Sequence, residues 1–202
     1  MGRKPTISND AIVHGAREVF LEAGPGAPTS RIAEACGVSE GTLFKRFGTK
    51  ESLFAAAMGL PPLEPVIGDI LTVRPGETAR KRCIRIGGLL VRFFVQVIPR
   101  MTTMFASGNL QPGKIFENDP KPPLELLRAV EKMFNSEIQE GRIALDDPEV
   151  AARMMLSTSH NLAFFETMGI EPTRTSEEQL EYMARMVNLL RFNEDQKENV
   201  CK

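Results

Sequence analysis

A glycine turn between two short helical patterns, in residues 29–50 (TSRIAEACGVSEGTLFKRFGTK), constrains the fold more than any other feature of this chain. Gly37 is placed to end the first helix, because glycine adopts positive φ at little cost. Apolar residues lie one helical turn apart on both sides of it: Ile32 with Cys36, and Leu43 with Phe47. This spacing predicts a helix, a tight turn and a second helix, which is the plan of the helix-turn-helix motif. A buried helical hairpin with no role in DNA binding would show the same pattern.

Short polar residues stand where the helices of this region should begin. We expect Thr29 to cap the helix before the turn, Ser39 the helix after it and Thr49 the next one, since hydroxyl oxygens accept from free amides at helix starts. In a helix-turn-helix motif, base contacts come from the exposed face near the start of the second helix. The residues in such positions are Glu40, Gly41, Thr42 and Lys45. Glu40 could accept a hydrogen bond from cytosine N4, or it could be an acid at a helix start with no base contact.

Several short motifs carry a family resemblance. Ile32-Ala33, Gly37-Val38-Ser39, Gly41-Thr42-Leu43-Phe44, Phe47 and Lys50-Glu51-Ser52-Leu53-Phe54 together resemble the DNA-binding domain of the TetR (tetracycline-repressor-like) family. The resemblance extends from about Ile12 to Met58. It implies an all-α fold with an N-terminal three-helix helix-turn-helix DNA-binding domain and a C-terminal helical domain for ligand binding and dimerisation.

The resemblance also implies roles for single residues. Ser30, Glu40, Thr42 and Lys45 match base-facing positions of the family, and Thr29, Phe44, Arg46 and Lys50 match phosphate-facing positions. Phe44 stands where the family usually has tyrosine, so one hydroxyl donor is missing. Lys50 is the firmer phosphate contact, because its ammonium group would stand beside a helix N-terminus, where an anion is already favoured.

The charge of the chain is nearly balanced. The 202 residues carry a net charge of −1, and the pI is about 6.2. DNA binding would therefore depend on local clusters of basic residues. Arg3 and Lys4 form one such cluster, in a short arm that could lie along phosphates or in a minor groove. An ordinary solvated terminus would have the same composition.

Helical patterns continue along the rest of the chain, and together they predict about nine helices and no strand. We expect a DNA-binding domain in residues 1–60 and a ligand-binding and dimerisation domain in residues 61–202. The expected helices are 8–23, 29–36, 40–47, 49–58, 77–98, 99–106, 122–141, 147–168 and one that begins near 175. We expect Ser8 and Asp147 to cap the helices that begin there, and Thr175 to form a capping box with Glu178. The basic residues Arg80, Lys81, Arg82, Arg85 and Arg92 indicate a solvated helix face or, less simply, a support for DNA phosphates.

Phenylalanine and methionine are frequent in the second region. Each could be an ordinary core residue, but in a TetR-like body the set implies an apolar small-molecule pocket among the middle helices. The candidate ligand-binding residues are Phe94, Met101, Phe105, Phe134 and His160. Because few charges fall among them, we expect a hydrophobic small-molecule effector. For His160, a core or interface histidine is the simpler interpretation.

The last two expected helices are apolar on more than one side, so they need a partner besides their own core. In TetR-like proteins the partner is the same helix pair of a second subunit, and a dimer would also match the two halves of a palindromic DNA operator. The resemblance therefore implies a homodimer through the last two helices. The residues expected at this interface are Ala151, Met155, Ser159, Leu162, Met183, Val187 and Leu190.

Catalytic and metal-binding motifs are missing from the sequence. The only histidines are His14 and His160, and the three cysteines, Cys36, Cys83 and Cys201, have no metal-ligand spacing. We expect no enzyme, no cofactor and no metal site. The free cysteines fit a cytoplasmic protein, and we see neither a signal peptide nor an apolar run long enough to span a bilayer.

These features predict a homodimeric repressor that a hydrophobic small molecule releases from a palindromic operator. The alternative is a helical ligand carrier or interaction module without operator binding.

Overall fold

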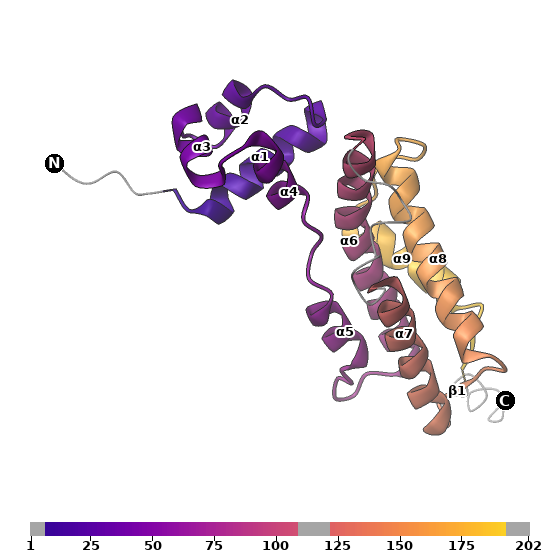
Figure 1. Cartoon of the computed structure of the whole chain (residues 1–202). Helices are drawn as coiled ribbons and strands as arrows, with labels where there is room; N and C mark the ends of the chain where they lie inside the picture. The colour runs from indigo at the N-terminus through magenta and orange to yellow at the C-terminus, as the bar shows by residue number, and fades with distance from the viewer. Residues whose placement is uncertain (1–6, 109–121, 193–202) are drawn as a thin grey trace. The chain divides into compact units, whose positions relative to one another are not determined.

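The computed structural model describes residues 7–108 and 122–192 (Figure 1), so Arg3 and Lys4 lie outside the described residues. Its described part contains nine α-helices and two strands of two residues each. It divides into two compact units, one with residues 7–60 and 99–108 and the other with 61–98 and 122–192. The two-domain boundary expected near residue 60 stays a prediction, since a compact unit need not fold by itself.

Four helices form most of the first unit: α1 (Asn9–Ala23), α2 (Thr29–Ala35), α3 (Glu40–Phe47) and α4 (Lys50–Met58). Their apolar faces meet in one core, whose fully buried large side chains are Ile12, Phe20, Ile32, Leu53 and Met58. The rings of Phe20 and Phe54 pack edge to face, with 5.0 Å between centroids. The predicted N-caps of α1, α3 and α4 are confirmed, because Ser8, Ser39 and Thr49 each accept from a backbone amide of the first turn.

Close packing of α1 on the end of α2 depends on a glycine. A Cβ atom on Gly15 would lie 2.9 Å from Sγ of Cys36. The Cys36 thiol donates to the carbonyl oxygen of Ile12 over 3.4 Å, and burial raises the pKa of this thiol above its ordinary value. Cys36 is therefore a packing residue of the core.

The second unit contains α5 (Glu64–Leu71), most of α6 (Ala79–Ala106), α7 (Pro122–Gln139), α8 (Pro148–Thr167) and α9 (Ser176–Val187). An antiparallel bridge pairs β1 (Ile143–Ala144) with β2 (Arg191–Phe192). The predicted caps are confirmed here too, since Asp147 caps α8 and Thr175 forms a capping box with Glu178. Large buried side chains in this core are Ile70, Ile86, Leu90, Met133, Phe134, Ile143 and Met155.

Two predictions about the helices of this region were wrong. The expected helices 77–98 and 99–106 are one continuous helix, α6, with Pro99 inside it. Proline lacks an amide donor and usually interrupts a helix, yet α6 continues through Pro99, whose carbonyl oxygen accepts from the Thr102 hydroxyl over 2.9 Å. Helix α5 was not predicted, because the proline-rich stretch at its start suggested a break.

The basic residues of α6 do not form a simple solvated face. Arg82 is buried and donates to Glu137 over 2.5 Å, and its other amino group donates to the carbonyl oxygens of Ile70 and Leu71 at the end of α5. Arg142 donates to the second carboxylate oxygen of Glu137 over 2.6 Å. The side chains of Arg82 and Glu137 are 3% and 1% exposed, so this ion pair ties α5, α6 and α7 together inside the core.

The residues predicted to form a subunit interface on α8 and α9 instead pack into the core of their own chain. Met155, Ser159, Met183 and Val187 are each 0% exposed, within a single chain. Ala151 and Leu162 are also buried in the same core, and Leu190 packs against it. Helical periodicity finds the apolar stripe but does not tell which side another α-helix of the same chain covers. These side chains are therefore not available to a second subunit, and any interface through α8 and α9 would use other side chains.

By length and composition alone, α6 could cross a bilayer, contrary to the expectation from the sequence. However, Ile86, Leu90 and Val91 of this helix are all fully buried in the protein core. The apolar stretch of α6 is 22% buried within the described residues, and one helix that is long and apolar enough is weak evidence for a membrane span.

Candidate nucleic-acid interface

The helix-turn-helix geometry comes from a short, fully hydrogen-bonded turn. After α2, Gly37 adopts φ 64°, and the amide of Val38 donates to the carbonyl oxygen of Ala33 over 3.0 Å. Ser39 then caps α3 by accepting from the amide of Thr42 over 3.2 Å. Leu43 is buried, so the opposite side of α3 faces solvent. The turn thus fixes the orientation of α3, and with it the residues that could meet a DNA groove.

The solvent-facing side of α3 carries four of the predicted contact residues. Glu40, Gly41 and Lys45 are exposed, and Phe44 is 44% exposed, which is unusual for a phenylalanine. A Cβ atom on Gly41 would meet only Oγ of Ser39, at 3.9 Å. The internal packing of the protein therefore does not require glycine here, although glycine weakens a helix. A close approach of DNA to α3 would explain its presence.

Thr29 and Glu40 join the starts of α2 and α3. The Thr29 hydroxyl donates to the Glu40 carboxylate over 2.5 Å. The prediction that Thr29 caps α2 is wrong, because the N-cap is Pro28 and no side chain caps this helix. The hydrogen bond from Thr29 instead holds the carboxylate at the exposed start of α3. Ser30, which follows Thr29, is exposed.

The predicted phosphate contacts differ in how they are engaged. Arg46 donates to the carbonyl oxygen of Ile7 and, over 3.4 Å, to the side chain of Asn9, so it fixes the chain at the start of α1. Within the described residues, Lys45 and Lys50 make no hydrogen bond or ion pair through their side chains. Lys50 stands in the first turn of α4, beside the amide ends that a phosphate would meet. Of the predicted contact residues that the structure describes, Lys45 and Lys50 are therefore the cations available to an anionic partner.

The predicted ligand-binding residues are divided between the two units. Phe94, Phe134 and His160 belong to the second unit, whereas Met101 and Phe105 belong to the first. The His160 ring packs edge to face on Phe94, with 5.3 Å between centroids, and stacks on Phe164 at 6.1 Å. Burial lowers the pKa of His160 below its ordinary value, because the charged form of the imidazole is less well solvated there. Phe134 is fully buried in the core.

The sequence of this region matches a known protein family. Residues 12–57 match the family model described as bacterial regulatory proteins, tetR family. The match covers α2, the turn and α3, and most of α1 and α4.

The chain contains the DNA-binding region of the TetR family of transcriptional regulators.

Solved TetR-family structures share the fold of nearly the whole chain. PfmR from Thermus thermophilus superposes with a TM-score of 0.59 at 21% identity, over 89% of this chain and 95% of PfmR. A TetR-like transcriptional regulator from Rhodococcus sp. RHA1 superposes with a TM-score of 0.60 at 16% identity, over 92% of this chain and 96% of that protein. These likenesses establish the all-helical TetR fold, and TetR-family regulators are not enzymes.

A sequence relative matches in the DNA-binding region alone. The HTH-type transcriptional repressor AcnR of Corynebacterium glutamicum is 50% identical over 56 residues, which are 27% of this chain and 30% of AcnR. AcnR of Corynebacterium efficiens is 48% identical over a stretch of the same length. The chain thus matches less than a third of the length of these curated relatives.

Proposed function

We propose that this TetR-family protein is a homodimeric repressor, which binds a palindromic operator and leaves it when a hydrophobic small molecule binds. The observation that carries the proposal is the exposed face of α3, where Gly41 leaves space, Glu40 is held by Thr29, and Lys45 lacks a side-chain partner within the described residues. Lys50, in the first turn of α4, also lacks one there. Backbone contacts would come from Lys50 and, by sequence, Arg3 and Lys4, and base contacts from Glu40, Thr42 and Lys45.

Exposed apolar residues of the last two helices support a dimer. Val150 and Met154 of α8, and Met168 directly after it, are 44–50% exposed. At helical spacing the three side chains lie on one side of α8. Tyr182 and Leu189 continue such a surface on α9 and just after it, and Leu189 is 75% exposed. Two helices with exposed apolar faces would be covered by the same pair of a second subunit. Two heads about 34 Å apart would then meet successive major grooves.

For an effector to release the protein from its operator, a structural change at the ligand-binding residues must reach the DNA-binding residues. α6 is one continuous helix that carries Phe94 in the second unit and Arg100 in the first. A ligand beside Phe94 and His160 that displaces α6 would therefore also displace Arg100, which holds the end of α4. Such a ligand lowers operator affinity if it binds the displaced state more tightly.

Selection of bound DNA from a random pool tests this function. The purified protein should enrich a palindrome, and hydrophobic compounds from a screen should reduce its binding. If no sequence is enriched while a hydrophobic compound still binds the protein, the protein is a ligand carrier without operator binding.

A further inference from the structure

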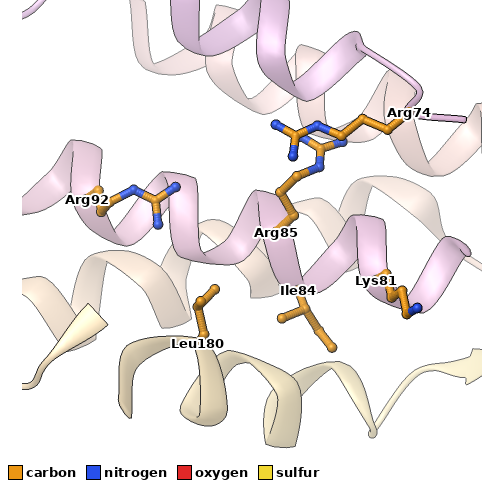
Figure 2. Close-up of a pocket in the computed structure, with 6 residues that line it drawn as sticks. All are labelled: Arg74, Lys81, Ile84, Arg85, Arg92 and Leu180. Carbon is orange, nitrogen blue, oxygen red and sulfur yellow. The ribbon is translucent and has the colours of Figure 1, made fainter. Parts of the chain in front are cut away.

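A basic groove on the second unit is lined by none of the ligand-binding residues proposed above. It has a volume of about 350 Å³ and is lined by Arg74, Lys81, Ile84, Arg85, Arg92 and Leu180 (Figure 2). Arg74 precedes α6, four of the residues belong to α6, and Leu180 belongs to α9. Four of the six lining side chains are cationic and none is acidic.

Arg85 is held within the protein by hydrogen bonds and is therefore not the cation that a ligand would meet. It donates to both carboxylate oxygens of Glu77, over 2.7 and 2.9 Å, and to the carbonyl oxygens of Asp69 and Thr72, each over 3.1 Å. The hydrogen bond from Arg85, against the opposing effect of burial, holds the pKa of Glu77 below its ordinary value, and the charge of Arg74 acts in the same direction. Glu77 therefore compensates Arg85 and part of the charge of Arg74.

Lys81 and Arg92 supply charge that no acid in the described residues compensates. Both are exposed, and neither side chain makes a hydrogen bond or ion pair there. Exposed cations are common, but here they stand on either side of an apolar surface. Figure 2 shows Ile84 and Leu180 projecting into the space between α6 and α9, with Lys81 and Arg92 farther along α6 in opposite directions.

A glycine shapes the position of Arg92. A Cβ atom on Gly88, one helical turn before Arg92, would lie 3.3 Å from Nη1 of Arg92 and 2.5 Å from Cδ2 of Leu180. The guanidinium group therefore lies back along α6, above the glycine, and close to the apolar surface of Leu180. Any residue larger than glycine at this position would force Arg92, Leu180 or both to move.

We propose that this groove binds a small amphipathic anion, in which a phosphate or carboxylate is joined to an apolar body. The anionic group would pair with Arg92 or Lys81, since charge-assisted hydrogen bonds are the stronger kind. The apolar body would cover Ile84 and Leu180, which are only half-buried in the free protein. The proposal does not depend on operator binding, because it concerns a different surface and a different class of ligand.

Calorimetric titration of the full chain with octyl phosphate, below its micelle concentration, tests the proposal. The test variant is Lys81→Gln/Arg92→Gln, and the matched control is Arg128→Gln/Lys132→Gln, which removes two exposed cations from α7. The test variant should bind octyl phosphate about tenfold or more weakly than the unchanged protein, and the control should bind it within about twofold. Inorganic phosphate and octanol should each bind far more weakly than octyl phosphate. Equal melting temperatures of the two variants exclude unfolding as the cause.

Vesicles distinguish a free anion from a lipid headgroup. Co-sedimentation with phosphatidylglycerol vesicles that the test variant loses, together with weak binding of free octyl phosphate, would identify the anion as a lipid headgroup. Saturable binding of free octyl phosphate without vesicle binding identifies a soluble ligand. The proposal is wrong if both variants bind octyl phosphate and vesicles as the unchanged protein does, or if inorganic phosphate binds as tightly as octyl phosphate.

Discussion

Arg100, near the C-terminal end of α6, donates a hydrogen bond of 2.8 Å to the carbonyl oxygen of Gly59, just after α4. Arg17 of α1 donates one of 2.7 Å to the carbonyl oxygen of Ala57. Two guanidinium groups thus hold the C-terminal end of α4, where the helix dipole favours cations. Only one of them belongs to α6, so the pair offers a matched test of how a ligand signal would reach the DNA-binding helices.

Substitution Arg100→Met should weaken the effect of the effector on operator binding. The side chain is 8% exposed, and loss of its charged hydrogen bond should lower the free energy of unfolding by about 1.5–3 kcal/mol. The ratio of operator affinities without and with effector should fall toward one, because α6 no longer holds α4. Fluorescence anisotropy with labelled operator measures this ratio. Arg17→Met is the control, and an equal loss of response in both variants would argue against transmission through α6.

Substitution Gly41→Ala should separate stability from DNA binding. Alanine stabilises a helix interior by up to about 1 kcal/mol relative to glycine, and its Cβ atom has room within the protein. If DNA approaches α3 closely at Gly41, the same methyl group reduces operator affinity. Thermal unfolding and gel retardation measure the two quantities. Unchanged or tighter operator binding would place the DNA contact elsewhere.

The buried ion pair should make stability depend on pH. Burial alone would raise the pKa of Glu137, but hydrogen bonds from Arg142 and Arg82 outweigh it and hold this pKa below the ordinary value of 4.5. A carboxylate with a lowered folded-state pKa stabilises fully above the unfolded-state value, and this contribution is lost as pH falls through the folded-state pKa. Urea unfolding between pH 7 and pH 3 should therefore show stability falling below about pH 4.5.

Substitution Glu137→Gln checks the source of that pH dependence. At pH 7 it should lower the free energy of unfolding by about 3–5 kcal/mol, because Arg82 is left buried without its partner charge. The decline below pH 4.5 should be smaller in this variant than in the unchanged protein. The double variant Arg82→Met/Glu137→Leu should be more stable than Glu137→Gln. Parallel pH profiles for the unchanged protein and Glu137→Gln would contradict this role of the pair.

Substitution Met154→Arg should produce a monomer. Met154 is 45% exposed on α8, so a charge there costs little in the monomer but is unfavourable inside an apolar interface. Light scattering after size exclusion measures the mass directly. Leu124→Arg, on α7 and 38% exposed, is the control and should remain a dimer. A dimeric Met154→Arg variant would exclude this face of α8 as the interface.

Local signals in the sequence predicted most of the helix starts. Ser39, Thr49, Asp147 and Thr175 were recognised as caps because the interaction involves neighbouring residues only. Thr29 was the exception, since its hydroxyl bonds to Glu40, eleven residues away. A hydrogen bond between helices leaves no local pattern by which it could have been found.

Features that depend on tertiary packing were not predictable in the same way. The apolar stripe through Met155 and Ser159 was visible, but not that it faces the core of its own chain. The burial of Arg82 depends on Glu137, far along the sequence. Similarly, Pro99 suggested a helix start, whereas α6 continues through it. For the candidate interface, the residue types of α3 were sufficient to indicate its exposed side, but the engagement of Arg46 with Ile7 was not foreseeable.

The most direct test of operator binding is gel retardation of DNA from the region upstream of the protein's own gene, at moderate salt. The unchanged protein should retard a fragment with a palindromic site, with an affinity that falls steeply as salt rises. The variant Thr42→Val/Lys50→Gln should lose this binding but retain its fold and its hydrophobic ligand. If the unchanged protein retards no such fragment, or if the variant retards it equally well, the α2–α3 surface does not read an operator.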